Sequence, residues 1–143
     1  MKRVMVINGP NLNLLGQREP EKYGELTLED LETRMNNKFP QLDFIFHQTN
    51  IEGEIVELIH AAAKDGIDGI IINPGGFSHT SVVILDAIKA VDLPVVEVHL
   101  TNLCKREDFR QVLITGSACM GVIQGGGFAS YLSGVHLLIE NTI

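Results

Sequence analysis

The sequence has 143 residues, 45% of them hydrophobic and 20% charged, which is enough chain to bury a core in one domain. Eighteen acidic against eleven basic residues give a formal charge of −7 without a Lys/Arg run, which argues against binding to nucleic acid or to an anionic membrane surface. The first apolar run is too short for a signal peptide, no stretch could span a bilayer, and Cys104 and Cys119 lack zinc-site spacing, so we expect a reduced, cytoplasmic protein.

The N-terminal half alternates strand and helix patterns. Arg3–Asn8 is a continuous apolar run, which is typical of a strand buried on both faces, and a Gly-Pro turn ends it. Thr27 is a suitable N-cap for a helix that extends to about residue 39. Residues 42–49 predict a second strand, and Glu52–Lys64 predicts a second helix with one apolar face.

The C-terminal half continues the alternation. Gly69–Asn73 is the clearest buried strand, and a helix should begin between residues 78 and 81. A strand over 94–98, a short helical piece over 106–111 and a strand over 119–124 follow. A last helix carries apolar residues at steps of three and four: Phe128, Tyr131, Leu132, Val135, Leu138 and Ile139.

This order of elements predicts an α/β fold. Five strands that alternate with helices in a chain of this length imply a doubly wound parallel sheet between two helix layers, a three-layer α/β/α arrangement. We expect a flavodoxin-like strand order. Because the sequence has no repeat, low-complexity segment or linker, residues 1–143 are predicted to form a single catalytic domain.

Polar residues gather where the predicted strands end. In a doubly wound sheet, ligands bind outside the carboxyl ends of the strands. The ends of the first, third and fourth strands and the turns after them bring amides, imidazoles and a carboxylate to that edge: Asn8, Asn11, Asn73, His79, Glu97, His99 and Thr101. The sequence therefore predicts a ligand site at this edge of the sheet.

Two histidines in this set have different predicted roles. Glu97 and His99 are two apart on a strand and share a face, so the carboxylate can fix the tautomer of the imidazole and raise its pKa, as suits a general acid. A purely structural ion pair is an equal alternative from the residues alone. His79 follows a turn near a helix N-terminus, where a neutral hydrogen-bonding role is favoured.

The remaining polar features are less specific. The polar loop over 17–25 is typical of a lid; Arg18 in it could lower the pKa of Tyr23, although solvated surface is the commoner explanation of such a pair. Arg110 could be an ordinary surface charge. The glycines at 125–127 fit a tight turn better than a phosphate cradle, and no His pair has metal-site spacing, so no metal site is predicted.

Five ordered segments resemble one enzyme family. VINGPNLNLLGQREPEKYG, QTNIEGEIVELIH, INPGGFSHTSVVILDAI, PVVEVHLTN and REDFR are similar, in order and spacing, to the blocks of type II 3-dehydroquinate dehydratases, over almost the whole chain. The resemblance implies a cytoplasmic, flavodoxin-like enzyme of the shikimate pathway, and so of aromatic amino-acid biosynthesis. Such an enzyme converts 3-dehydroquinate to 3-dehydroshikimate by anti elimination through an enolate, without a metal or cofactor.

The resemblance also implies roles for catalytic residues at the matching positions. Tyr23 would remove the proton alpha to the ketone, and Arg18 would keep that phenol anionic. Asn11 would hold a water against the enolate oxygen. His99, oriented by Glu97, would protonate the departing hydroxyl.

Substrate contacts and assembly follow from the same resemblance. The substrate carboxylate would bind Asn73 and the backbone of Leu100 and Thr101, and the ring hydroxyls would bind His79 and Arg110. The family forms homododecamers built from trimers. In such an assembly Asp86 would reach the site of a neighbouring subunit.

Some positions depart from the family pattern. Ile51 and Cys104 stand where many relatives have His, Phe77 stands where Tyr is frequent, and Ser130 stands where Gly is common. The stretch 111–121 is more apolar than expected. None of these positions is a proposed proton-transfer residue.

Two other functions compete with this interpretation. A non-catalytic flavodoxin-like module that binds a small anionic metabolite or nucleotide would explain the fold and the polar edge. A hydrolase or lyase of another class is the second alternative, but the sequence has no GxSxG motif and no lysine in the segments at the predicted site. Tyr23→Phe distinguishes the dehydratase from these alternatives. Only in the dehydratase should this substitution abolish turnover while binding is largely retained.

Overall fold

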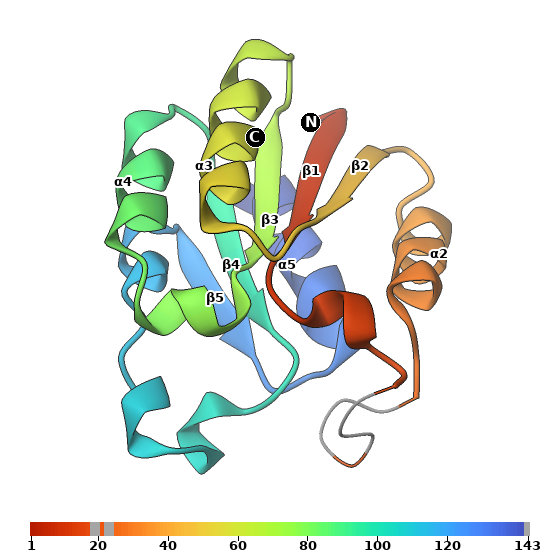
Figure 1. The fold of residues 1–143 in the computed structure, drawn as a ribbon. Helices are drawn as coiled ribbons and strands as arrows, with labels where there is room; N and C mark the ends of the chain where they lie inside the picture. The colour runs from red at the N-terminus through yellow and green to blue at the C-terminus, as the bar shows by residue number, and fades with distance from the viewer. Residues whose placement is uncertain (18–20, 22–24, 142–143) are drawn as a thin grey trace.

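A five-stranded parallel sheet forms the centre of the protein, in a computed structural model that describes residues 1–17, 21 and 25–141 (Figure 1). Its strand order is β2-β1-β3-β4-β5, which confirms the flavodoxin-like arrangement. The strands are β1 (Arg3–Asn8), β2 (Asp43–Gln48), β3 (Gly69–Asn73), β4 (Val95–His99) and β5 (Gly121–Gln124).

Helices cover both faces of the sheet, as predicted. They are α2 (Leu28–Lys38), α3 (Glu52–Lys64), α4 (Val82–Ala90) and α5 (Phe128–Asn141). Successive strand residues point to opposite faces. Val4 and Val6 therefore pack with α2 and α5, whereas Met5 and Ile7 pack with α3 and α4. Figure 1 shows α3 and α5 on opposite sides of the strands.

The element boundaries agree closely with the sequence prediction. β1, β3 and α3 have the predicted ends, and the other strands are displaced or shortened by one or two residues. Thr27 caps α2 through a capping box with Asp30, and Ser81 caps α4 by accepting a hydrogen bond from the Ile84 amide. Both caps satisfy backbone amides that the first helical turn leaves without a partner.

Short 3₁₀ turns follow the carboxyl ends of the strands and shape the loops there. After β1 comes η1 (Leu12–Leu14), and after β3 comes η2 (Gly75–His79). The segment between β4 and β5 contains η3 (Leu103–Lys105), η4 (Asp108–Arg110) and η5 (Thr115–Ala118). The predicted helical piece at 106–111 is therefore a single 3₁₀ turn, flanked by two more turns that the sequence pattern did not indicate.

Across the described residues, every helix is too short or too polar to cross a membrane.

Candidate active site

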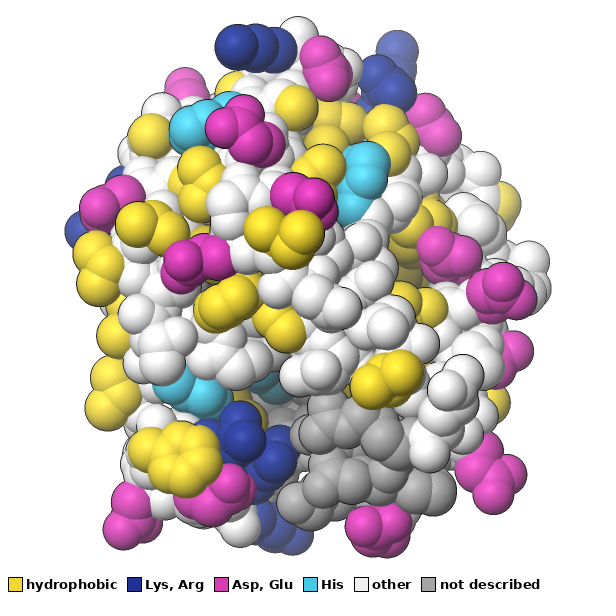
Figure 2. All heavy atoms as spheres, in the orientation of Figure 1, with side chains coloured by type: hydrophobic (Ala, Val, Ile, Leu, Met, Phe, Trp, Pro, Cys, Tyr) yellow, Lys and Arg dark blue, Asp and Glu magenta, His cyan; other side chains and the backbone are white. Residues whose placement is uncertain are grey.

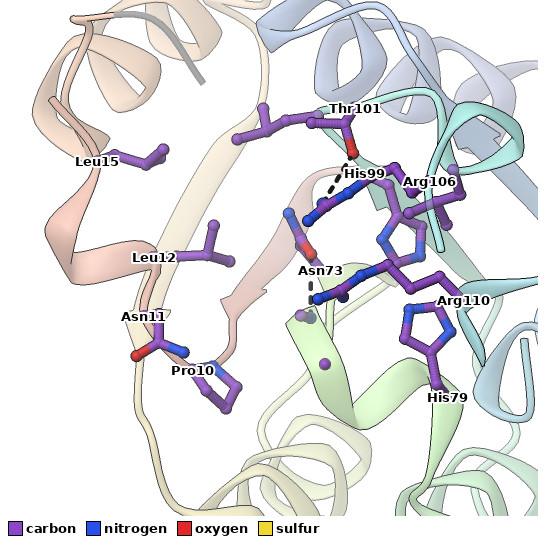
Figure 3. A pocket seen from close by; sticks show the side chains of 14 residues that line it. Pro10, Asn11, Leu12, Leu15, Asn73, His79, His99, Thr101, Arg106 and Arg110 are labelled. Atoms are coloured by element: carbon purple, nitrogen blue, oxygen red, sulfur yellow. Dashed lines mark hydrogen bonds between the residues drawn. The ribbon is translucent and has the colours of Figure 1, made fainter. Parts of the chain in front are cut away.

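A pocket opens at the carboxyl edge of the sheet, where the sequence predicted a site (Figure 3). Loops after β1, β3 and β4 supply its walls. The lining residues are Pro10, Asn11, Leu12, Leu15, Asn73, Gly75, Gly76, His79, His99, Leu100, Thr101, Leu103, Arg106 and Arg110. Segments that are far apart in the sequence thus converge because parallel strands all end at the same edge.

Close backbone packing brings the loops after β1 and β3 together. The Gly9 amide donates to the Asn73 carbonyl at 2.8 Å. A Cβ atom on Gly9 would lie 2.7 Å from the Pro74 carbonyl oxygen, so a side chain at this position would force the two loops apart. This glycine therefore fixes the width of the pocket between Asn11 and Asn73.

Asn11 lies on the β1 side of the pocket in a left-handed conformation, with φ of 71°. Asn adopts this region more readily than most residues. Its amide donates to Asn50 Oδ1 at 3.0 Å, and Gln48 Nε2 donates to the same oxygen at 3.1 Å. These bonds hold the backbone of Asn11, while its side chain is exposed at the pocket wall.

Asn73 ends β3 beneath the pocket and is almost fully buried. Its Oδ1 accepts from the Gly75 amide at 3.1 Å, and its Nδ2 donates to the Tyr131 hydroxyl at 2.9 Å. Both ends of the carboxamide are therefore held by the protein itself. The contact with Tyr131 could not be predicted from the sequence, because the helical pattern explains Tyr131 equally well as a core residue.

Glu97 and His99 form the predicted pair on β4. His99 Nε2 donates to Glu97 Oε2 at 2.8 Å, and both side chains are buried. The second carboxylate oxygen, Oε1, accepts from the Thr115 hydroxyl. Because Nε2 is engaged with the carboxylate, Nδ1 is the ring nitrogen left to exchange a proton with a ligand.

Thr115 comes from the stretch 111–121, to which the sequence analysis gave no function. It is fully buried, at the start of η5. Cys119 lies in the same stretch, and burial followed by the negative charge of Glu97 raises the pKa of its thiol to about 12. This segment therefore forms the wall behind Glu97 and keeps water from the carboxylate.

His79 ends η2, two residues before the N-cap of α4. Its Nδ1 donates to the Val112 carbonyl at 2.9 Å, which places the proton of the neutral ring on Nδ1. Nε2 is then an acceptor for a ligand hydroxyl. The expected neutral, hydrogen-bonding role is consistent with this geometry.

Two arginines lie beside the histidines, and one of them, Arg110, is a site residue predicted from the sequence. Arg110 donates through Nε to Glu107 at 3.3 Å, and its guanidinium lies 5.1 Å from the centre of the Phe109 ring. Arg106, which was missed, also lines the pocket and donates to Thr101 Oγ1 at 3.4 Å. The Glu107 backbone amide, followed by Arg110 and Arg106, lowers the pKa of the Glu107 carboxyl.

The backbone after β4 is fixed by the glycine-rich turn. The amides of Gly125 and Gly127 donate to the carbonyls of His99 and Leu100, at 3.3 and 3.0 Å, and the Gly126 amide donates to Ser130 Oγ at 2.9 Å. All three glycine amides are therefore occupied within the chain, as the tight-turn interpretation predicted. Ser130, which stands where the family pattern has glycine, accepts the hydrogen bond from the Gly126 amide.

Basic side chains gather at the pocket although the protein is acidic. Arg106, Arg110, His79 and His99 line it, whereas the buried charge of Glu97 lies behind His99. Figure 2 shows histidine and basic side chains together at the lower end of the molecule, with most acidic side chains elsewhere on that face. This arrangement favours a small anionic ligand rich in hydroxyl groups.

One described candidate residue, Asp86, lies away from this pocket. Asp86 is exposed on α4 and is absent from the pocket lining. Arg18 and Tyr23 lie outside the described residues. Of the departures from the family pattern, Ile51 and Cys104 are exposed, and Phe77 packs against the core between α3 and α4.

Within residues 1–17, 21 and 25–141, no three His, Cys, Asp or Glu side chains cluster in a way that could hold a metal ion. The groups around the pocket are therefore hydrogen-bond donors, acceptors and a proton-exchanging imidazole. Such a set can bind an anion and move protons.

Comparisons with known proteins agree with this chemistry. The model of a family described as dehydroquinase class II matches residues 2–139. A 3-dehydroquinate dehydratase from Fusobacterium nucleatum is 50% identical, covering 96% of this chain and 97% of that protein. One from Carboxydothermus hydrogenoformans is 49% identical, covering 96% and 90%.

A solved structure gives the same result. The type II dehydroquinase from Butyrivibrio crossotus superposes with a TM-score of 0.94 at 38% identity, over 96% of this chain and 97% of the other. The match extends across the strands and loops that form the pocket. The chain therefore belongs to the class II dehydroquinase family.

Proposed function

We propose that the protein dehydrates 3-dehydroquinate to 3-dehydroshikimate in the shikimate pathway, by anti elimination through an enolate. The observation that carries the proposal is the buried Glu97–His99 pair at the wall of a pocket lined by arginines, in a chain that matches type II dehydratases over nearly its full length. A cytoplasmic location is carried over from the family resemblance alone.

The substrate carboxylate would bind at the floor of the pocket. Asn73 can donate from Nδ2, and the backbone of Leu100 and Thr101 borders the same space. Amide donors suit a carboxylate because hydrogen bonds to an ionised acceptor are roughly twice as strong as neutral ones. This orientation would fix which ring carbons face the catalytic groups.

The ring hydroxyls would bind to His79 and Arg110, which also line the pocket. His79 Nε2 is an acceptor, since Nδ1 already donates to Val112. Arg110 is a donor whose position is set by Glu107. A donor beside an acceptor recognises a hydroxyl group, which needs both. Arg106 lines the pocket close to Thr101 and adds positive charge.

The first chemical step would remove the proton alpha to the ketone. Tyr23 is the proposed base, and Arg18 is proposed to keep its phenol anionic; the family resemblance supports both, and neither lies among the described residues. Charge that develops on the ketone oxygen needs a donor, and a water held by Asn11 would supply it. The left-handed turn at Asn11 presents its side chain to the pocket.

The second step would expel the hydroxyl on the other side of the ring. His99 is the proposed acid and would donate from Nδ1, while Glu97 on Nε2 stabilises the imidazolium. Glu97 is itself held by Thr115, so the carboxylate does not need to move during the reaction. Base and acid on opposite faces of the substrate account for the anti stereochemistry.

We further propose a homododecamer built from trimers, in which Asp86 completes the site of a neighbouring subunit. Asp86 is exposed and does not line the pocket of its own subunit. Val82 and Val83, one turn away on α4, are 55% and 51% exposed. Exposed apolar residues beside an unused carboxylate suit an interface that buries both.

The direct test adds 3-dehydroquinate to purified protein and follows the ultraviolet absorbance of the conjugated enone product. We expect absorbance to rise with wild-type protein and to remain flat with Tyr23→Phe, whose circular dichroism spectrum and affinity for 3-dehydroshikimate should match those of wild type. No absorbance change with folded wild-type protein would reject the dehydratase function.

A further inference from the structure

The hydroxyl of Tyr131 joins the ends of two neighbouring strands. Tyr131 lies on α5 and is fully buried. Its hydroxyl donates to Asn8 Oδ1 at 2.6 Å and accepts from Asn73 Nδ2 at 2.9 Å. Asn8 and Asn73 are paired in the register of β1 and β3, so one phenol bridges two asparagines side by side at the edge of the sheet.

The direction of each hydrogen bond follows from one fixed donor. The Gly75 amide can only donate, so the atom of Asn73 that faces it at 3.1 Å must be the oxygen. The atom facing Tyr131 is then the amide nitrogen, which donates to the phenol oxygen. The phenol proton is thereby directed to Asn8.

This arrangement determines what Asn73 offers to a ligand. Its oxygen is taken by Gly75, and one of its two amide hydrogens is taken by Tyr131. The second amide hydrogen remains for the pocket that Asn73 lines. Figure 3 shows the carboxamide beneath the pocket, with its oxygen bonded to the loop after β3. Asn73 therefore presents a donor, which suits a carboxylate ligand.

Burial favours the neutral, proton-donating form of the phenol. Burial raises the pKa of Tyr131 above its usual value, although the hydrogen bond from Asn73 acts in the opposite direction. A neutral hydroxyl keeps the direction of all three bonds unchanged. Packing of the ring alone would be satisfied equally well by phenylalanine, which could not make either contact.

We propose that Tyr131 is a positioning residue, whose hydroxyl holds the Asn73 carboxamide with an N–H toward the pocket and so sets the preference of the site for a carboxylate. The identity of the ligand rests on the proposed function; the orientation of Asn73 does not.

The test compares Tyr131→Phe with wild type in steady-state turnover of 3-dehydroquinate. The Gly75 amide still holds the oxygen of Asn73 in this variant. Loss of the bond to the phenol leaves the nitrogen end of the carboxamide without its restraint, so KM should rise about tenfold while kcat stays within about twofold. Ser81→Ala is the matched control: it removes a buried hydroxyl that caps α4, where it accepts from the Ile84 amide and does not contact Asn73. Its KM should equal that of wild type.

Calorimetric binding of 3-dehydroshikimate and of its carboxamide separates this inference from the proposed function. Even if wild type does not turn over 3-dehydroquinate, Tyr131→Phe should lose affinity for the acid and lose more for the acid than for the amide. If Tyr131→Phe does not fold, Asn8→Ala releases the phenol proton and should weaken acid binding in the same direction. Unchanged KM and unchanged preference for the acid, or equal effects of Ser81→Ala, would overturn the inference.

Discussion

Two buried polar clusters lie at the same edge of the sheet, on opposite faces. Glu97 and His99 alternate with Val96 and Val98 and so face the α3 and α4 side, where Thr115 joins them. Asn8 and Asn73 face the α2 and α5 side, where they meet Tyr131. The first cluster contains a carboxylate and an imidazole; the second contains amides and a phenol.

Burial alone does not determine the role of a polar cluster. No fully buried side-chain nitrogen or oxygen in the described part of the chain lacks a hydrogen-bond partner, so both clusters meet the general requirement for buried polar groups. The cluster with titratable groups can move a proton, whereas the neutral cluster can only orient the group that it holds. We therefore propose a chemical role for the first cluster and a role in substrate binding for the second.

Substitutions in the cluster of Glu97, His99 and Thr115 should change turnover most. His99→Ala removes the proposed acid and should lower kcat by about 10²- to 10⁴-fold, with affinity for 3-dehydroshikimate nearly unchanged. Initial rates at saturating substrate measure this. His136→Ala, at an exposed imidazole on α5, is the control and should behave as wild type. A His99→Ala enzyme within twofold of wild type would remove His99 from the mechanism.

The cluster of Asn8, Asn73 and Tyr131 should make a contribution to the free energy of unfolding that is constant at neutral pH and falls only at high pH. Tyr131→Phe leaves buried amides without a partner and should lower the free energy of unfolding by about 1–3 kcal/mol. The folded-state pKa of Tyr131 is raised, so this stability is fully present below the unfolded pKa and is lost as pH rises above about 10. Urea unfolding should show that the difference in the free energy of unfolding between wild type and Tyr131→Phe is smaller at alkaline pH than at neutral pH. A difference that stays constant with pH would contradict this prediction.

Thr115 tests whether the carboxylate must be held as well as present. Thr115→Val keeps the shape but removes the hydroxyl donor to Glu97, and should lower kcat about tenfold. Thr115→Ser keeps the donor and should retain at least about half of the wild-type rate. If valine and serine have the same rate, the hydroxyl has no part in orienting Glu97.

The two thiols should differ in how fast they are alkylated. Burial and the charge of Glu97 raise the pKa of Cys119 to about 12, so the thiolate that reacts with alkylating agents is scarce at neutral pH. Cys104 is exposed. Iodoacetamide at pH 8 followed by peptide mass spectrometry should label Cys104 first and Cys119 after unfolding. Equal labelling of the folded protein would mean that the wall behind Glu97 opens to water.

The sequence predicted the strands well because buried parallel strands are short apolar runs between turn residues. It also predicted which polar residues meet at the edge, since their positions follow directly from where the strands end: Asn73 at the end of β3, and His99 at the end of β4. The shared face of Glu97 and His99 follows from the two-residue period of a strand.

The partners of these residues could not be predicted in the same way. Tyr131 lies 58 residues from Asn73 and 123 from Asn8, and its place in an apolar helical pattern gave no sign of what its hydroxyl contacts. Thr115 lies in a stretch without strong periodicity, and Arg106 is one charge among several in its segment. Such contacts depend on how helices and loops pack onto the sheet, which local patterns do not specify.

The most direct test of the contrast between the clusters is a side-by-side measurement of kcat and KM for Glu97→Gln and Tyr131→Phe with 3-dehydroquinate. Glu97→Gln keeps the shape of the side chain but removes the negative charge that faces Nε2 of His99. We predict that it lowers kcat by about 10²-fold or more with a small change in KM, whereas Tyr131→Phe raises KM and leaves kcat nearly unchanged. If both substitutions change the same parameter, the division between a catalytic and a binding cluster is contradicted.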